Sequence, residues 1–270
     1  MRSQKLSILQ CIRVSRGCLS YVVVSEKKAA IIDPLRNIAF YSSLLEEEAM
    51  QLEWVLDTHA HADHISGGRD LAKQHGAPYL LHPYDGIHPI DMLPATYSYE
   101  PSWSGKTYQL GKVQLQTLHI PGHTLGNLAF VLDGKYLFCG DSLFLRSIAR
   151  PDLGGRTEAW TPLHYKSLQS LMQLPDDILI LPAHFASPEE ANEDFSYGKT
   201  LGELKKTNEE LQLLKKSFQA FEHHITQHIP HFPPEYIDIK RVNLGLLEPT
   251  EEKAEELEMG KNICALSRNS

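Results

Sequence analysis

The chain carries three histidines and an aspartate within six consecutive residues, directly after an apolar segment. That segment, Leu52–Asp57, is predicted to be a β-strand because it is short, apolar and followed by a turn. Alternation at a strand end would point His59, His61 and Asp63 to one side, and His64 follows as the chain turns. Imidazole and carboxylate groups are the usual protein ligands for zinc, iron and manganese. The segment therefore predicts a metal site at the end of a strand.

Three more ligand candidates repeat this pattern, in which an apolar strand ends close to a glycine or proline and then a histidine or aspartate follows. They are His123 in Pro-Gly-His-Thr, Asp141 in Gly-Asp, and His184 in Pro-Ala-His. A surface loop that is rich in histidine by chance would not repeat this pattern at distant strand ends. We therefore predict one metal centre, built from His59, His61, Asp63, His64, His123, Asp141 and His184.

The composition is that of a soluble globular protein, with 270 residues of which 42% are hydrophobic and 22% charged. No apolar run approaches the roughly 20 residues of a membrane helix, and the N-terminus lacks a signal-peptide pattern. The net charge of −8 argues against nucleic acid as a partner, because non-specific binding needs a basic surface. Four scattered cysteines do not indicate a disulfide framework, so we expect a cytoplasmic protein with no membrane partner.

Short β-branched segments separated by turn residues predict strands in both halves of the chain. The expected strands are Ser7–Val14, Leu19–Ser25, Ala29–Asp33, Leu52–Asp57, Tyr79–Leu81, Val113–Ile120, Leu128–Leu132, Tyr136–Cys139 and Ile178–Leu181. Helical spacing predicts helices at Asn37–Met50, Arg69–His75 and Pro162–Gln173, the last with Thr161 as its N-cap. Strands interspersed with helices, twice over, indicate an α/β fold with two sheets covered by helices.

Two regions do not follow this alternation of strands and helices. Asp85–Gly105 is rich in Pro, Tyr and Ser and is predicted to be a long surface loop. After His184 the chain becomes more charged: we expect a long helical stretch at Gly202–His228, an extended segment at Phe232–Leu247 and a solvated acidic segment at Glu251–Glu258.

The order H-x-H-x-D-H, P-G-H-T, G-D and P-A-H resembles the metallo-β-lactamase superfamily, with all seven ligand positions filled between Leu19 and His184. The resemblance implies an αββα sandwich over 1–190 as the catalytic domain, with 191–270 as a helical and extended C-terminal extension. In the dinuclear members, one metal ion would use His59, His61, His123 and Asp141. The other would use Asp63, His64, His184 and the shared Asp141.

Two branches of the superfamily are similar to this chain. Hydroxyacylglutathione hydrolase (glyoxalase II) uses two metal ions, zinc, iron or manganese, to cleave a thioester. Persulfide dioxygenase uses one Fe(II) ion and O₂ to oxidise a persulfide to sulfite. In that branch the resemblance implies iron held by His59, His123 and Asp141, a two-histidine, one-carboxylate facial triad. The remaining histidines and Asp63 would then surround these ligands.

Three features favour the dioxygenase. Asp141 follows His123 by 18 positions, which resembles the compact hairpin of persulfide dioxygenases. The segment after Asp141 resembles theirs, and the resemblance implies that Arg150 lies beside the substrate. A structural ion pair between Arg150 and Asp152 is the alternative for this arginine. The tail resembles the short dioxygenase C-terminus at Phe232–Asp238 and lacks the larger glutathione-binding domain of the hydrolase.

One difference between this chain and the glutathione-using relatives concerns the substrate. Glu209 and Glu210 follow Asn208, where glutathione-using relatives have a basic residue. This argues against glutathione persulfide and leaves coenzyme A persulfide or another low-molecular-weight thiol persulfide open. The prediction is therefore a mononuclear iron persulfide dioxygenase, with a dinuclear thioester hydrolase as the alternative. Its partner is a small-molecule thiol persulfide or thioester, and a homodimer is compatible with either.

The remaining histidines and aromatic residues are expected to be less informative. His75, His82, His88 and His164 are predicted to lie in loops or on the surface, and the tail histidines 223, 224, 228 and 231 on a solvated helix face. Cys139 is predicted to be a small buried hydrophobic residue. Tyr97, Tyr99 and Trp103 would either cap the active site or pack against the tail.

Overall fold

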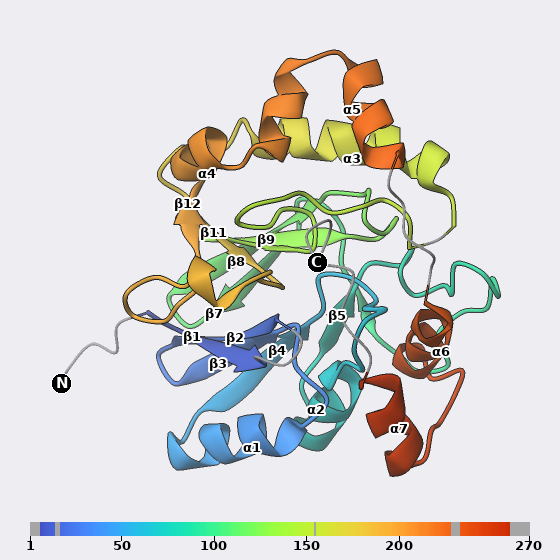
Figure 1. Ribbon diagram of the computed structural model, residues 1–270. Helices are drawn as coiled ribbons and strands as arrows, with labels where there is room; N and C mark the ends of the chain where they lie inside the picture. Colours follow the sequence, from blue (N-terminus) through green and yellow to red (C-terminus); the bar gives the residue numbers. More distant parts are fainter. Residues whose placement is uncertain (1–5, 14–16, 154, 228–232, 260–270) are drawn as a thin grey trace.

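Two six-stranded sheets lie face to face in the computed structural model, and helices cover the outer face of each (Figure 1). The structure describes residues 6–13, 17–153, 155–227 and 233–259. This αββα arrangement confirms the predicted fold class. None of the helices in these described ranges is both long and apolar enough to cross a membrane.

The first sheet has the strand order β1-β2-β3-β4-β5-β6. Its strands are β1 Ser7–Arg13, β2 Cys18–Ser25, β3 Lys28–Ile32, β4 Gln51–Leu56, β5 Tyr79–Leu81 and β6 Glu100–Pro101. Strands β3 to β6 run parallel, connected in part by α1 Ile38–Glu47 and α2 Gly68–His75. The carboxyl ends of these parallel strands therefore meet at one edge of the sheet, where the histidine-rich segment follows β4.

The second sheet has the order β12-β11-β10-β9-β8-β7. Its strands are β7 Thr107–Leu110, β8 Val113–His119, β9 Leu128–Leu132, β10 Tyr136–Gly140, β11 Leu179–Pro182 and β12 Lys199–Thr200. Only β10 and β11 pair in parallel, with α3 Thr157–Leu171 in the connection between them. Asp141 and His184 directly follow these two strands, so the parallel pairing brings both residues to the same edge.

The core between the sheets consists of alternate side chains from both inner faces. Tyr21 and Phe138 meet across it, with ring centroids 5.0 Å apart in an edge-on arrangement. A second apolar cluster, which includes Ile31, Tyr41 and Leu71, lies between the first sheet and the helices α1 and α2. Because both faces of the first sheet are covered, most side chains of its central strands β2 and β3 are buried.

The start of α3 differs from the prediction. The helix begins at Thr157 with Arg156 as its N-cap, and Pro162 lies inside it. The hydroxyl of Thr161 donates to the carbonyl of Thr157 at 2.7 Å, a contact of a helix interior and not of a cap. A Thr-Pro pair predicts the start of a helix, because proline favours the first helical position. Here the helix continues through the proline.

The tail contains more breaks and more helices than predicted. The expected helix over 202–228 is divided into α4 Leu201–Thr207, the 3₁₀ helix η2 Glu210–Lys215 and α5 Phe218–Thr226, after a short η1 at Pro188–Glu190. The prediction of an extended segment over 232–247 is wrong. The helix α6 Pro234–Asn243 forms there, with Pro234 at its first helical position. The acidic segment forms α7 Glu251–Leu257, which Thr250 caps.

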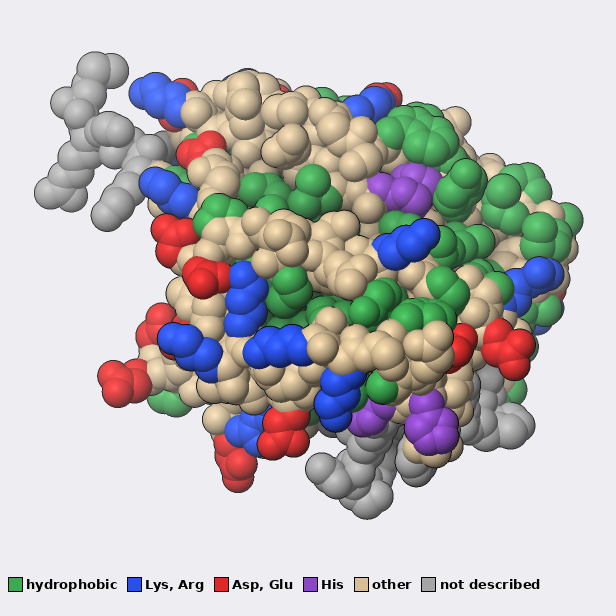
Figure 2. Space-filling model, turned by 90° about the horizontal axis from the view of Figure 1, so that it is seen from above, with side chains coloured by type: hydrophobic (Ala, Val, Ile, Leu, Met, Phe, Trp, Pro, Cys, Tyr) green, Lys and Arg blue, Asp and Glu red, His purple; other side chains and the backbone are tan. Residues whose placement is uncertain are grey.

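The face covered by α3, α4 and α5 shows basic and acidic side chains interspersed along its margin (Figure 2). No continuous basic surface appears among the described atoms of this face, in keeping with the net charge of −8. On the opposite side of the molecule, α6 and α7 lie beside the first sheet, close to the loop that follows β4 (Figure 1).

Candidate metal centre

The seven predicted residues gather at the edge of the sandwich, and each is at most 2% exposed. His59, His61, Asp63 and His64 lie in the loop after β4, and His123 lies between β8 and β9. The structure divides the seven among three groups of neighbouring donor atoms. The groups are His59, His123 and Asp141; Cys18, Asp63, His64 and His184; and Asp33, Asp57 and His61.

The first group, called here the His59 cluster, consists of two imidazoles and one carboxylate. The Oδ2 atom of Asp141 lies 3.5 Å from Nε2 of His123 and 3.9 Å from Nε2 of His59. These three atoms are buried, and none has a hydrogen-bond partner among the described residues. Burial without a partner costs free energy, so three such atoms facing one another need an explanation. A metal ion bound between them would supply it, and the donor set fits Fe(II).

Hydrogen bonds on the far side of each ring orient the two imidazoles. His123 Nδ1 lies 3.0 Å from the carbonyl oxygen of Arg150, which can only accept. His59 Nδ1 lies 3.0 Å from the hydroxyl of Thr58, which itself donates to the carboxylate of Asp33. Both rings therefore carry their hydrogen on Nδ1 and turn the Nε2 lone pair toward Asp141. Burial lowers the pKa of His123 and, more strongly, that of His59, so both rings are neutral, as ligands must be.

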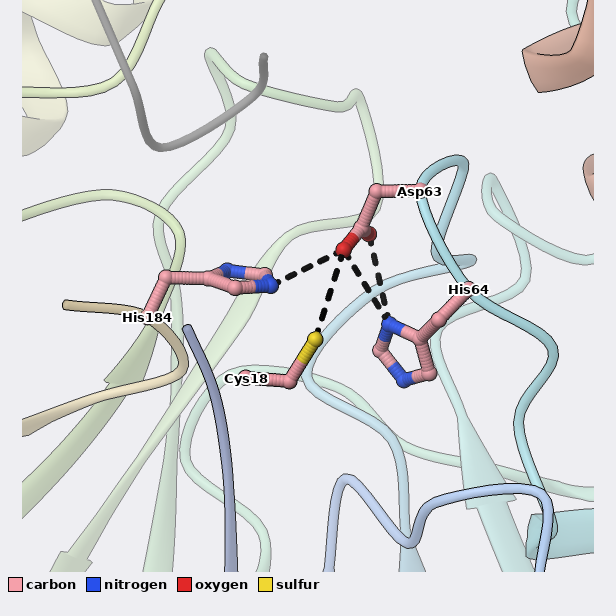
Figure 3. Close-up of side chains that lie close together, drawn as sticks. All are labelled: Cys18, Asp63, His64 and His184. Carbon is pink, nitrogen blue, oxygen red and sulfur yellow. Dashed lines mark hydrogen bonds and ion pairs between the residues drawn. The ribbon is translucent and has the colours of Figure 1, made fainter. Parts of the chain in front are cut away.

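The second group, called here the Cys18 cluster, is centred on the carboxylate of Asp63 (Figure 3). Its Oδ2 atom lies 2.9 Å from His184 Nε2 and 3.9 Å from the sulfur of Cys18, and its Oδ1 atom lies 3.3 Å from His64 Nδ1. Burial opposes ionisation here, but His184 and His64 lower the pKa of Asp63 well below its usual range. Cys18 was not among the predicted site residues.

A family model described as the metallo-beta-lactamase superfamily matches residues 14–184, which contain all seven predicted ligands. This chain belongs to the metallo-β-lactamase superfamily. A beta-lactamase hydrolase-like protein of Xylella fastidiosa (strain Temecula1 / ATCC 700964) is 29% identical over 223 residues, which are 71% of this chain and 49% of that protein. The chain thus spans about half the length of this curated relative.

Other similar proteins match over nearly their whole length. A hydroxyacylglutathione hydrolase of Pelagibacter ubique (strain HTCC1062) is 26% identical over 256 residues, 92% of this chain and 96% of that protein. The crystal structure of ETHE1 from Myxococcus xanthus superposes with a TM-score of 0.72, covering 88% of this chain and 99% of that one. At 24% identity, this likeness shows the shared fold.

Sequence reasoning missed a buried carboxylate that connects two ligand loops of this metallo-β-lactamase fold. Asp85 Oδ2 accepts hydrogen bonds from the backbone N–H of Ala60 at 2.8 Å and the hydroxyl of Thr124 at 2.7 Å. Its Oδ1 atom accepts from the backbone N–H of Gly126 at 2.7 Å. Asp85 therefore holds the loop of His59 against the loop of His123. No local spacing signals this role, because Asp85 lies in a segment read as a surface loop.

Arg150 lies beside the His59 cluster and is 6% exposed. Its backbone carbonyl accepts from His123, as described above, and its guanidinium Nη2 lies 3.6 Å from Oδ2 of Asp152. The ion pair that was the structural alternative is thus present. Contact with a substrate stays a prediction.

Four histidines were predicted to lie in loops or on the surface, and this is wrong for His164, which is buried inside α3. His82 and His88 lie in loops, as predicted, but their side chains are buried. His82, His88 and His164 are each at most 1% exposed. His82 stacks on His119 with ring centroids 4.1 Å apart, and His88 Nε2 lies 3.3 Å from the carbonyl of Ile237. These contacts join residues distant in sequence, and the local pattern of each histidine gives no sign of them.

The other secondary predictions have mixed outcomes. Cys139 is fully buried, as predicted. The Tyr97 hydroxyl donates to the carbonyl of Asn243 at 2.7 Å, so this residue packs against the tail. His223 lies on α5, and the neighbouring His224 pairs with Glu210 at 3.2 Å. The histidines at 228 and 231 lie outside the described residues.

Proposed function

We propose that this chain is a mononuclear iron persulfide dioxygenase that oxidises a low-molecular-weight thiol persulfide to sulfite with O₂. The observation that carries the proposal is the His59 cluster. Nε2 of His59, Nε2 of His123 and Oδ2 of Asp141 face one another without another partner among the described residues. Two imidazoles and one carboxylate form the donor set of the facial triad, which leaves coordination positions open. When bound, iron would activate the O₂ that attacks the persulfide sulfur.

The surrounding residues would hold these three donors in place. Arg150 orients His123 through its carbonyl, Thr58 and Asp33 orient His59, and Asp85 joins the two loops. Such hydrogen bonds to the outer nitrogen of a ligand are typically worth 10- to 100-fold in metal affinity or activity. A rigid triad would keep its three protein ligands on the iron when the substrate binds.

The substrate would be bound as an anion. A persulfide is anionic, and Arg150, whose backbone carbonyl accepts from His123, carries a buried guanidinium. Guanidinium groups bind such anions through charge-assisted hydrogen bonds. The carboxylate of Glu210 accepts from the backbone N–H of Ile148, two residues before Arg150. An acidic group at this place offers no positive charge for the carboxylates of glutathione, which argues against glutathione persulfide and leaves coenzyme A persulfide or another low-molecular-weight thiol persulfide open. A cytoplasmic location fits the buried thiols Cys11 and Cys139, which form no disulfide.

A dinuclear thioester hydrolase is the second candidate. The observation that favours it is the likeness to a hydroxyacylglutathione hydrolase over 92% of this chain. In that case Asp63, His64 and His184 would bind a second metal ion at the reaction centre. Two such metal ions would generate a hydroxide instead of activating O₂.

Oxygen consumption separates the two candidates. The protein is purified without oxygen, loaded with Fe(II), and supplied with coenzyme A persulfide or glutathione persulfide in an oxygen-electrode cell. We expect iron-dependent O₂ uptake and sulfite formation with at least one of these persulfides. S-lactoylglutathione is tested beside them with zinc-loaded protein. If no persulfide supports O₂ uptake and the thioester is cleaved, the hydrolase is the correct function.

A further inference from the structure

A lysine lies on the buried face of α6, where an apolar residue would be expected. Tyr236, Ile239 and Lys240 share this face at helical spacing, and Lys240 is 3% exposed. Tyr236 packs against Ala62, so this face of the helix covers the loop after β4 (Figure 1). Burying an ammonium group costs free energy that an apolar side chain would not cost. A role for the charge itself is therefore expected.

The ammonium group of Lys240 is anchored beside the first ligand of the His59 cluster. Its Nζ atom donates to the carbonyl of Ala60 at 2.5 Å, and Ala60 follows His59 directly in the chain. Burial lowers the pKa of His59 and of His123, and the positive charge of Lys240 acts in the same direction on both. The charge therefore reaches the two imidazoles that face Asp141, although Lys240 belongs to the tail.

We propose that Lys240 is a specificity-determining charge of the metal centre, which favours an anionic ligand over a neutral one on the metal ion of the His59 cluster. The inference rests on a metal ion bound there, as in the proposed function. A divalent ion held by two neutral imidazoles and one carboxylate keeps a net positive charge, and the ammonium group adds another nearby. A persulfide and sulfite are both anions, so the charge would stabilise the bound substrate and the bound product.

The same charge should weaken the binding of the metal ion itself. A cation repels a metal ion but attracts an anion bound to that ion. Removal of the charge from Lys240 should therefore raise the affinity for metal and lower the affinity for an anion. A lysine with a merely structural role would give a different result, because a loosened ligand loop would bind metal more weakly.

Three variants separate the charge from the structural contact. Lys240→Gln keeps a hydrogen-bond donor near Ala60 without the charge, Lys240→Arg keeps both, and the control Lys253→Gln removes an exposed charge that pairs with Glu256 on α7. Metal-free protein is titrated anaerobically with Co²⁺, a spectroscopic substitute for Fe(II), and the loaded protein is then titrated with azide. We expect Lys240→Gln to bind Co²⁺ roughly 10-fold more tightly and azide roughly 10-fold more weakly than wild type, the order expected for unit charges about 10 Å apart at an effective dielectric constant of about 20. The other two variants should match wild type.

The directions of the two changes decide the outcome. If Lys240→Gln binds azide as tightly as wild type, or binds Co²⁺ no more tightly, the lysine only supports the fold. If that variant does not fold, Lys240→Met takes its place, and equal affinity of the wild-type Co²⁺ protein for azide and for neutral imidazole would also overturn the proposal. Neither titration uses a persulfide or O₂, so this proposal and the proposed dioxygenase reaction can fail independently.

Discussion

Asp141 is the residue at which the two clusters meet. Its Oδ2 atom faces the imidazoles of His59 and His123, and its Oδ1 atom lies 2.5 Å from Nδ1 of His184. Burial would raise the pKa of Asp141, but the adjacent His184 lowers it, so the carboxylate is ionised and available as a ligand. One side chain therefore connects the His59 cluster with the Cys18 cluster.

Single histidine replacements distinguish a histidine that binds the proposed iron from a histidine that lies beside its ligands. His123→Ala should lose iron and activity, because it removes one of three facial-triad donors. His61→Ala should keep iron with affinity reduced about 10- to 100-fold, since His61 contacts Asp33 and lies outside the triad. His75→Ala, whose ring contacts Ser42 away from the site, is the control. Iron per chain is measured by elemental analysis; full iron in His123→Ala would refute the triad.

Arg150→Ala tests the proposed substrate contact. The variant should keep its iron, because the backbone carbonyl that orients His123 remains. It should lose about 2–4 kcal/mol of transition-state stabilisation, roughly 30- to 1,000-fold in kcat/KM for the best persulfide. Arg146→Ala is the matched control, since Arg146 is largely exposed and 3.7 Å from Glu190. Equal kcat/KM in wild type and a folded, iron-loaded Arg150→Ala would show that the Arg150 side chain does not bind the substrate.

Residue spacing predicted the seven donors of this site because they lie in the segments that follow four apolar strands, β4, β8, β10 and β11. His123 and Asp141 needed only a short apolar strand and a glycine to be recognised. Cys18 and Asp85 could not be found in this way. Their roles depend on pairings between distant segments, Gly17 with Phe185 and Asp85 with Gly126, which no local pattern encodes.

At the scale of elements, a glycine after β10 aims Asp141 at the metal centre. Gly140 has φ +55°, and the register between β10 and β11 shifts at this point. An added Cβ would lie 2.5 Å from the hydroxyl of Thr58, the group that orients His59. The close approach therefore links both sheets at the site.

Gly140→Ala and Gly134→Ala separate backbone strain from packing. Gly134 has a similar φ of +67° but nothing within 4 Å of an added Cβ. We expect Gly134→Ala to lower the free energy of unfolding by about 1–2 kcal/mol through strain alone. Gly140→Ala should cost about 2–4 kcal/mol, because crowding against Thr58 adds to the strain, and should also weaken iron binding. Urea unfolding measures both; equal costs would contradict the packing argument.

Helices and strands were predicted correctly where the hydrophobic residues followed a clear period. They were predicted incorrectly where a proline was the main signal. The nine predicted strands match β1 to β5 and β8 to β11 to within a few residues, because their alternating and apolar patterns are strong. The short strands β6, β7 and β12 were not predicted. Two predictions based on proline were wrong. Pro162 lies within α3 and does not begin it, and Pro234 begins α6 where an extended segment was expected. Proline fixes only its own φ, so neighbouring packing decides whether a helix passes through it, begins at it or is absent.

In the whole molecule, α6 packs against the loop after β4, which carries the first ligands of the metal centre. Asn243 on α6 donates to the carbonyls of His61 and His64 at 2.9 and 3.0 Å and accepts from the N–H of Ser66 at 2.9 Å. Lys240 donates to the carbonyl of Ala60 at 2.5 Å. The division into 1–190 and 191–270 stays a prediction, but these contacts give the ligand loop partners that the first part of the chain does not provide.

Asn243→Ala should therefore lower the affinity of the metal centre for iron, although Asn243 is not itself a proposed ligand. The change leaves two carbonyls and one N–H of the ligand loop without their present partner, which should cost about 1–3 kcal/mol. A less ordered loop binds iron more weakly, so added iron should raise the Tm of this variant less than that of wild type. Asn192→Ala is the control, because it removes an amide that bonds Ser196 and Gly198 in a turn after η1. Thermal unfolding with and without Fe(II) measures the effect. If iron raises the Tm of Asn243→Ala as much as that of Asn192→Ala, the tail supports the fold without supporting the metal centre.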